Sequence, residues 1–546
     1  MGPFGAPLFG AIMHRNKSVS TAHFAMTPRP DVPRSSFKIQ KSHKTTFDAG
    51  YLIPIYVDEV LPGDSFNVRA TMFARLATPL FPIMDNMHLD TFFFFVPNRL
   101  VWQNWQKFMG EQENPGDTTD YVIPQLTSPV GGYAPLSISD YFGLPTAGQV
   151  DAASTVTHSA MWHRAYNLIY NEWFRDENLQ DSVVVPTGDG PDLQATYALR
   201  RRGKRHDYFT SCLPWPQKGQ AVGLPLGSYA PVVVGPLNNG QPGFNNALSG
   251  VPVSGAVTGA ATSGLLEVGG FGALFDPNGT LYADLSASTA VTVNALRQSF
   301  QIQRLLERDA RGGTRYTEIL RAHFGVVSPD ARLQRPEYLG GGSTPINVNP
   351  IAQTSGTPPA GEDQTPLGTL GAMATGLQGG IGFSQSFVEH GMIIGLCMAR
   401  ADLHYQQGLR KMWSRKTRYD YYFPAFSHLG EQAVLNKEIY VQGLPADDLV
   451  FGYQERWAEY RYNPSNITGL FRSTTTGTID NWHLAQRFTT LPTLAATFIE
   501  ENPPLERTLA VGAAANGQQF IMDSFYDIRA ARPLPMYSTP GLIDHF

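Results

Sequence analysis

Two short segments of this 546-residue sequence combine positive charge with aromatic rings at close spacing. Five cations lie between residues 200 and 206, next to a Tyr-Phe pair, and a second group alternates with Trp and Tyr between residues 410 and 422. Cations release counterions from phosphates and aromatic rings stack on bases, so this combination suits a single nucleic-acid strand. The candidate residues are Arg200, Arg201, Arg202, Lys204, Arg205, Arg410, Lys411, Trp413, Arg415, Lys416 and Arg418.

The same residue types also favour contacts between protein subunits. Arg, Tyr and Trp are enriched in protein interfaces. Only 16% of the residues are charged, well under the roughly 25% of typical soluble domains, which indicates that much of the surface meets protein. We therefore expect the two basic runs either to bind nucleic acid or to form interfaces, and we favour interfaces because an assembling chain has more interface than nucleic-acid surface.

Signals for enzymatic chemistry are weak. The sequence contains no phosphate-binding P-loop, no His-Glu-x-x-His motif and no Gly-x-Ser-x-Gly nucleophile elbow. Glu455 and Glu459 are a candidate carboxylate pair for polysaccharide cleavage, provided that they share a helical face. We expect no enzymatic activity and no cofactor.

Metal binding and disulfide formation are also not expected. His158 and His163 lie five residues apart on an expected helix, which would point them about 140° apart, so one metal ion could not readily bind both. Two cysteines, Cys212 and Cys397, cannot make a zinc quartet and are expected to be buried reduced thiols.

Charge is unevenly distributed along the chain. The whole sequence has a formal net charge of -5, whereas its first fifty residues hold seven cations and only two carboxylates. Residues 1–48 are rich in Pro, Ser and Lys, which predicts a basic arm that becomes ordered only against partners. Its cations are Arg15, Lys17, Arg29, Arg34, Lys38, Lys41 and Lys44.

The elements that would position these residues are mainly short β-strands. Residues 51–57, 65–73 and 89–96 are rich in β-branched and aromatic residues and are separated by turn sequences. The four phenylalanines at 92–95 require their strand to be buried on both faces. Helical spacing of apolar residues appears at 161–173, and again at 293–323 with a break at the Gly-Gly pair 312–313.

Two segments of low complexity interrupt this pattern. Residues 219–290 contain no Lys or Arg and predict short strands that need one another, or a neighbouring copy, for burial. Residues 339–382 are rich in Gly, Pro and Thr, and we expect them to form an extended surface or inter-subunit crossing.

Blocks along nearly the whole chain resemble the major capsid proteins of microviruses, the Microviridae, specifically the gokushovirus-like branch. The longest, residues 83–111, includes MHLDTFFFFVPNRLVWQNWQKFMG, and it is both long and specific. The other blocks are RRRGKRHDYF (200–209), LPWPQ (213–217), LLERDARGGTRY (305–316), SPDARLQRPEY (328–338), GYQERWAEYR (452–461) and PGLIDHF (540–546).

This resemblance implies a mainly β fold, a single eight-stranded antiparallel jelly roll of the viral capsid type with long loop and helical insertions. It implies a core at 49–218 and 291–546 and a variable surface insertion at 219–290 that forms a protrusion at the three-fold axes. It also implies about sixty copies in a T=1 icosahedral shell around a circular single-stranded DNA genome. Implied partners are a small basic DNA-packaging protein, an internal scaffolding protein, a DNA-pilot minor protein and a host surface receptor.

The expected location is the virion capsid, assembled in the bacterial host cytoplasm without membrane insertion. Without the resemblance, the main rival is a secreted carbohydrate-binding β-sandwich, for which high aromatic, Gly and Pro content is also ordinary. The N-terminal residues lack a basic-then-apolar signal peptide, which counts against secretion.

Overall fold

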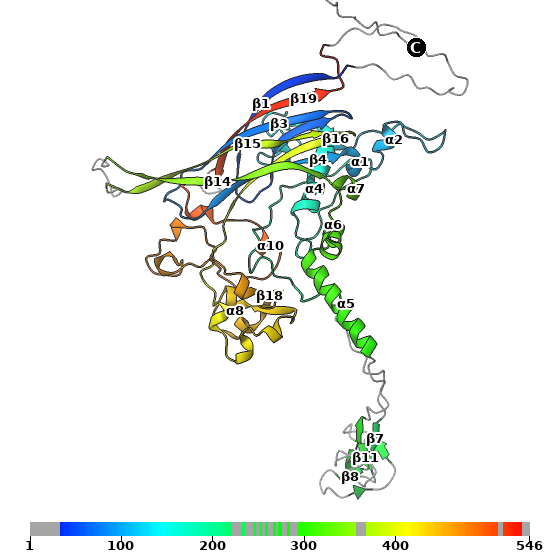
Figure 1. Ribbon diagram of the computed structural model, residues 1–546, viewed down its shortest axis with the longest axis vertical. Helices are drawn as coiled ribbons and strands as arrows, with labels where there is room; N and C mark the ends of the chain where they lie inside the picture. The colour runs from blue at the N-terminus through cyan, green and yellow to red at the C-terminus, as the bar shows by residue number, and fades with distance from the viewer. Residues whose placement is uncertain are drawn as a thin grey trace, which may run out of the picture.

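Eight long antiparallel strands form a two-layered β-sandwich at one end of the molecule (Figure 1). The computed structural model describes residues 33–220, 222, 293–355, 367–510 and 517–537, together with seven short strands between residues 232 and 283. The sandwich strands are β1 (Ser35–Phe47), β2 (Ile53–Val60), β3 (Ser65–Leu76), β4 (Met87–Pro97), β14 (Glu337–Ala352), β15 (Leu370–Ser386), β16 (Gly391–Ala401) and β19 (Phe520–Arg532).

The strand order is that of a jelly roll. It runs β1-β19-β3-β15-β14-β4-β16-β2, so that β1, β19, β3 and β15 form one layer and β14, β4, β16 and β2 form the other. Strand β14 links the layers because residues 337–346 pair with β4 whereas residues 347–352 pair with β15. The predicted eight-stranded antiparallel jelly roll is thereby confirmed.

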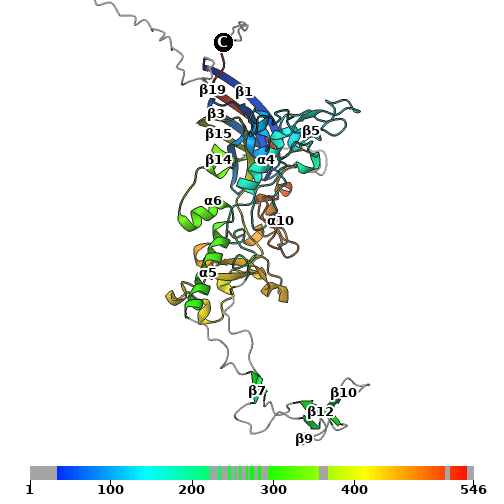
Figure 2. The same cartoon turned by 90° about the vertical axis from the view of Figure 1, so that its right-hand side faces the viewer.

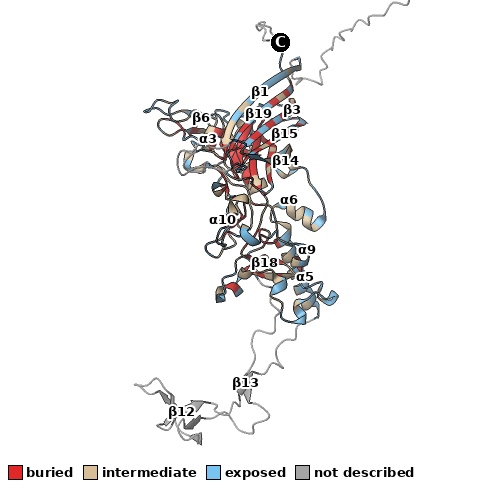
Figure 3. Cartoon of the chain, turned by 90° about the vertical axis from the view of Figure 1, so that its left-hand side faces the viewer, coloured by how far each residue is buried: buried red, intermediate tan, exposed pale blue. Residues whose placement is uncertain are grey.

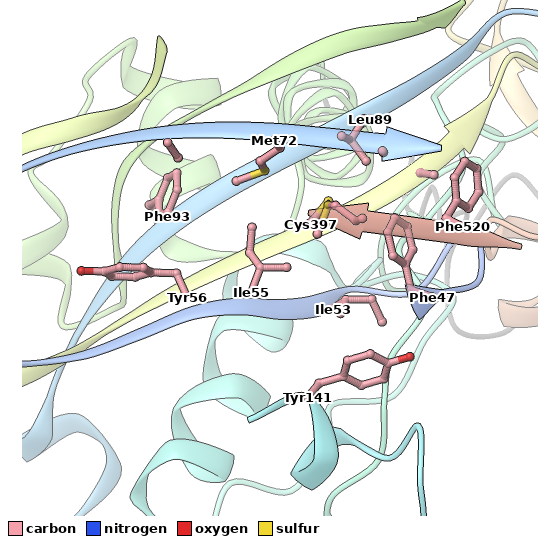
Figure 4. Packing of buried hydrophobic residues seen from close by; sticks show 14 of the residues in the cluster. Phe47, Ile53, Ile55, Tyr56, Met72, Leu89, Phe93, Tyr141, Cys397 and Phe520 are labelled. Atoms are coloured by element: carbon pink, nitrogen blue, oxygen red, sulfur yellow. The ribbon is translucent and has the colours of Figure 1, made fainter. Parts of the chain in front are cut away.

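The main hydrophobic core fills the space between the two layers (Figure 4). Strand β3 alternates buried and exposed residues along its length, as expected of a strand with one face on a core. The rings of Phe47 and Phe520 stack 5.1 Å apart, and Tyr56 contacts Tyr526 across the layers at 5.2 Å between centroids. These contacts fix the register of the outer strands against the centre of the sandwich.

Strand β4 is buried on both faces, as its four phenylalanines predicted. Phe93 and Phe95 belong to the core between the layers. Phe94 points to the other face, into a second core that includes Tyr166 and Ile169 of helix α4 (Met161–Ile169). The helix therefore covers the outer face of the layer that contains β4.

The expectation that residues 1–48 form an arm ordered only by partners is wrong for residues 35–47. These residues form β1, which pairs along its whole length with β19, from Ser35 opposite Arg532 to Phe47 opposite Phe520. Polar residues alternate with half-buried ones in β1, as in a strand that lies at the edge of a sheet and exposes one face. Residues 1–32 lie outside the described residues.

Most of residues 339–382 belong to β14 and β15, two long strands of the sandwich, and a crossing to a neighbouring subunit stays a prediction. Glycine is required where these backbones approach others. At Gly382, φ is +151° and an added Cβ would lie 1.9 Å from the carbonyl oxygen of Val68. The glycines that made this segment resemble a loop therefore allow close strand packing.

Both predicted helical regions are present. Helix α4 continues through a π-turn at Tyr170–Phe174. Helix α5 (Val293–Gly312) ends at the predicted Gly-Gly break, and α6 (Tyr316–Ile319) continues through a π-turn to Gly325, which has φ +69°. Short helices elsewhere are α1 (Asn98–Val101), α2 (Trp105–Phe108), α3 (Ile138–Tyr141), α7 (Asp330–Leu333), α8 (Asn436–Ile439), α9 (Ala458–Arg461) and α10 (Ala496–Ile499).

A long insertion between β16 and β19 forms a subdomain below the sandwich (Figures 1 and 2). Its own apolar core includes Tyr405, Val434, Phe451 and Phe498. The subdomain contains the two-stranded antiparallel sheet of β17 (Glu431–Leu435) and β18 (Val450–Glu455). A second two-stranded sheet, of β5 (Gln125–Thr127) and β6 (Thr157–Ser159), lies beside α4. In the part of the chain that the structure describes, no helix is both long and apolar enough to cross a bilayer.

The short strands expected within residues 219–290 are present and pair with one another. They form a five-stranded sheet and a separate pair. The strands are β7 (Val232–Val234), β8 (Phe244–Asn246), β9 (Pro252–Val253), β10 (Val257–Gly259), β11 (Leu266–Val268), β12 (Phe271–Phe275) and β13 (Leu281–Ala283).

The role of β1 gives a direct prediction about truncated chains. A chain that begins at Asp48 loses the whole β1 ladder and the Phe47 ring, and it exposes the edge of β19, so we expect it to aggregate. A chain that begins at Pro33 keeps the ladder and should be soluble, with an unfolding temperature close to that of the full chain. Soluble yield and thermal unfolding check this, and equal behaviour of the two truncations would contradict it.

Candidate functional site

The first basic run lies between the sandwich and the subdomain, where Arg201 joins the two. Its guanidinium lies 4.0 Å from the centre of the Tyr51 ring and donates a hydrogen bond of 2.8 Å to the carbonyl oxygen of Glu501. The Arg200 backbone N–H donates to the hydroxyl of Tyr166. These contacts attach the run to the residue pair before β2, to helix α4 and to the end of the subdomain.

Arg202 belongs to a buried ion cluster around Asp90 of β4. The Asp90 side chain is only 3% exposed and lies 3.1 Å from Arg202 and 2.8 Å from Arg400 of β16. Burial, and next the neighbouring Arg400 charge, lowers the pKa of Arg202 to about 10. The Arg202 guanidinium also lies 4.9 Å from the centre of the Phe92 ring. The positive charges of Arg202 and Arg400 are therefore directed toward an acid of their own subunit.

The last two cations of the run are bound to the subdomain. Lys204 Nζ donates to the carbonyl oxygen of Phe498 and to Gln486 Oε1, and burial lowers its pKa to about 8. Burial likewise raises the pKa of the neighbouring Glu501 to about 7. Arg205 forms a half-exposed ion pair of 2.8 Å with Asp402. DNA binding by the first run stays a prediction, but most of its charges, those of Arg201, Arg202, Lys204 and Arg205, already have partners within the chain.

A large basic cavity of about 980 Å³ opens beside this run. Arg311 and Arg315, contributed by the α5–α6 region, face it and are paired with Glu431 and Glu177 respectively. Because acids neutralise most of these guanidiniums, the cavity has less free positive charge than its arginine content indicates. Its cationic lining residues are Arg175, Arg202, Lys204, Arg205, Arg311, Arg315, Arg321 and Arg400.

The second basic run divides into an anchored part and an exposed part. Arg410 donates to the carbonyl oxygen of Pro464, and Lys411 donates to that of Ala433. Arg415 forms an ion pair of 3.2 Å with Glu459 and lies against the rings of Tyr421 and Tyr460. These three cations hold the subdomain together.

The exposed part contains the candidates that remain accessible to a partner. Lys416 and Arg418 are exposed, and Arg418 lies 4.9 Å from the centre of the Tyr419 ring. The side chain of Trp413 is 70% exposed. So large an exposed ring beside other exposed aromatics is typical of a protein contact surface. The neighbouring exposed aromatics are Tyr419, Tyr421, Tyr422 and Phe423.

The described arm cations lie along β1 or just before it. Arg34 donates to Ser65 Oγ, and Lys44 forms an exposed ion pair of 2.8 Å with Asp523. Lys41 points inward, 4.1 Å from the centre of the Tyr56 ring, and burial lowers its pKa. Lys38 is exposed. The remaining three arm candidates, Arg15, Lys17 and Arg29, lie outside the described residues.

The histidine geometry corrects one expectation. His158 lies on strand β6 and not on the helix, so its ring approaches that of His163 to 5.4 Å between centroids. The Nε2 atoms are hydrogen bonded to Tyr133 and Ser139 respectively. Burial lowers the pKa of His163 to about 3, so the ring is neutral and acts in packing.

The candidate carboxylate pair is not arranged for hydrolysis. Glu455 ends β18 whereas Glu459 lies in α9, so the two do not share a helix. Glu455 pairs with Arg461, and Glu459 accepts a hydrogen bond from Gln432 besides its ion pair with Arg415. Both carboxylates serve structural contacts. Cys212 and Cys397 are buried free thiols, as predicted.

Sequence comparison agrees with the jelly-roll fold of the chain. The model of the family described as Capsid protein (F protein) matches residues 25–542. The chain belongs to this capsid protein family. It is 49% identical to the capsid protein VP1 of Bdellovibrio phage phiMH2K, over 96% of this chain and 98% of that protein. It is 44% identical to VP1 of Chlamydia phage 1 (96% and 98% covered) and 36% identical to VP1 of Spiroplasma virus 4 (95% and 97% covered).

These matches confirm the resemblance to the microvirus capsid proteins of the gokushovirus-like branch. The chain is a structural protein of the phage virion that assembles into a capsid, and it is not an enzyme. The carbohydrate-binding and hydrolase alternatives are therefore wrong.

Sequence reasoning missed the acids that hold the first basic run. Asp90 and Asp402 lie on and after strands remote from residues 200–205, so no local pattern linked them to the run. It also missed exposed cations on the strands of the sandwich, including Arg69 and Arg75 of β3. The alternation of residue types along β3 could have predicted them, because every second side chain of a strand lies on the same face.

The Asp90 cluster predicts which acid stabilises the subunit. Asp90→Asn leaves two largely buried guanidiniums without a carboxylate and should lower the free energy of unfolding by about 3 kcal/mol. The matched change Asp402→Asn removes a half-exposed partner and should cost less than about 1 kcal/mol. Urea unfolding of the full chain measures both values. Equal losses in the free energy of unfolding would show that burial does not determine how much the Asp90 cluster stabilises the subunit.

Proposed function

We propose that about sixty copies of this capsid protein form a T=1 icosahedral shell around a circular single-stranded DNA genome. The observation that supports this proposal is the match to the capsid family along nearly the whole chain. Each chain contributes one jelly roll, and its subdomain exposes large aromatic residues such as Trp413 that a neighbouring copy would cover.

The net charge supports a role for cationic partners. A shell whose chains each have a net charge of -5 cannot neutralise the phosphates of its genome through overall charge. We propose that a small basic packaging protein supplies cations inside the shell. An internal scaffolding protein and a DNA-pilot minor protein complete the proposed partners, and assembly takes place in the host cytoplasm.

We further propose that residues 219–290 form a surface protrusion near the three-fold axes that contacts a receptor on the host. This segment contains no Lys or Arg, so it is poorly suited to face phosphates. Its short strands pair with one another, which suits a separate module inserted into the capsid fold.

Electron microscopy and nuclease-protection assays test the proposed shell. Purified particles should be closed T=1 shells that contain circular single-stranded DNA protected from nuclease. Duplex DNA or RNA inside the particles, or a shell of another triangulation number, would contradict the proposal.

A deletion tests the proposed protrusion. Replacement of residues 219–290 by a short Gly-Ser bridge should leave the jelly roll folded, because loop closure costs only about 0.6 kcal/mol per doubling of loop length. The deleted virions should contain DNA but fail to adsorb to host cells, as measured by the fraction of virions left unbound. Normal adsorption, or failure of antibodies against this segment to reach it on intact virions, would contradict the assignment.

A further inference from the structure

One face of the sandwich is not covered by any described part of the chain. The layer of β1, β19, β3 and β15 packs on the core with one face, and the other is exposed, as the alternation of buried and exposed residues shows (Figure 3). Figures 1 and 3 place this layer at the end of the molecule remote from β18. We call this exposed face of the four strands the open sheet face.

The open sheet face is basic although the chain is acidic. Its charged residues are five cations and two acids, a net charge of +3, whereas the whole chain has a net charge of -5. Strand β15 adds no charged residue. The charged residues of the face are Lys38, Lys44, Arg69, Arg75, Asp523, Asp527 and Arg529.

Four of these cations have no ion-pair partner among the described residues. Only Lys44 is paired, with Asp523. Lys38 stands directly opposite Arg529 in the register, and like charges opposite each other destabilise a sheet. Arg69 stands opposite Asp527 in the register, although the two form no ion pair. Arg75 has Ile521 and Thr375 opposite it, neither of which can neutralise its charge. An anion bound here would relieve this repulsion.

Aromatic rings lie among these charges. Phe73 of β3 and Phe525 of β19 are each 45% exposed, and no ring contact between described residues involves either of them. Phe73 stands opposite Asp523, while Phe525 stands opposite Thr71, so the two phenylalanines are diagonal neighbours about 7 to 8 Å apart. A base can stack on each ring while the flanking arginines contact phosphates.

We propose that the open sheet face binds the single-stranded DNA genome, with Phe73 and Phe525 stacking on bases and Lys38, Arg69, Arg75 and Arg529 contacting phosphates. This inference rests on the proposed function, that the shell encloses single-stranded DNA. Unpaired bases are required, because a duplex hides the ring faces that the phenylalanines would contact. An acidic protein segment would use the cations but would gain no base stacking.

The test uses the full-length chain and a fluorescent thirty-nucleotide oligo(dT), with affinity measured by anisotropy over a series of salt concentrations. Arg69→Gln with Arg75→Gln should weaken binding about ten-fold and lower the slope of log affinity against log salt by about 1.4, which corresponds to two phosphate contacts. Phe73→Leu with Phe525→Leu should weaken binding at least about ten-fold and leave the slope unchanged, because bases lose their stacking partners.

Matched controls separate this face from the second basic run and from net charge. Lys416→Gln with Arg418→Gln removes the same charge from the exposed subdomain and should change affinity less than about two-fold. Lys44→Gln with Asp523→Asn removes the paired ions of the open sheet face and should also have little effect. Thermal unfolding of every variant shows whether the fold is retained.

Each outcome decides the proposal. Unchanged affinity in the Arg69 and Phe73 double variants would overturn it, as would competition by polyglutamate as strong as that by oligo(dT), which would identify an acidic protein as the partner. Wild-type particles that lack single-stranded DNA would overturn the proposed function, whatever the oligonucleotide results. Ultraviolet cross-links from packaged DNA to peptides containing Phe73 or Phe525 would support both.

Discussion

The burial of strand β4 on both of its faces is the constraint on which the rest of the structure depends. Four consecutive phenylalanines place rings alternately in the core between the layers and beneath helix α4. Each buried ring contributes about 1.5 to 3 kcal/mol, so leaving either face open would expose several kcal/mol of apolar surface. The insertion that contains α4 is therefore as necessary to the subunit as the second layer of the sandwich.

The same strand also contacts charged residues of the first basic run. Asp90 of β4 binds Arg202 and Arg400, and Arg202 lies against Phe92, so the phenylalanine strand also fixes the first basic run. Buried ion pairs add little net stability, but they penalise any arrangement that separates them. The cluster thus specifies how the first basic run lies against the sandwich, and it leaves the run few free charges.

The sequence predicted those parts of the fold whose residues have a strong local pattern. The strands rich in aromatic residues and the helix that ends at Gly312 were predicted within a few residues. Strands β14 and β15 were not predicted, because glycine gives no periodic signal. Glycine is nevertheless required there, since an added Cβ at Gly341 would lie only 2.1 Å from the carbonyl oxygen of Thr91. The basic runs were visible as charge, but their acidic partners come from distant strands. The open sheet face was hidden for the same reason, since its cations belong to three separate strands.

The pairing of β1 with β19 also has a consequence for synthesis. Residues Gln40 and Asp527, which are hydrogen bonded in the sheet, are 487 positions apart in the chain. At a translation rate of about 5 to 20 residues per second, β1 leaves the ribosome roughly 25 to 100 s before its partner exists. Throughout that interval it is an unpaired strand, the kind of segment that seeds aggregation. Its lysines, with few apolar residues between them, keep the nascent strand in water until the last strand of the chain arrives.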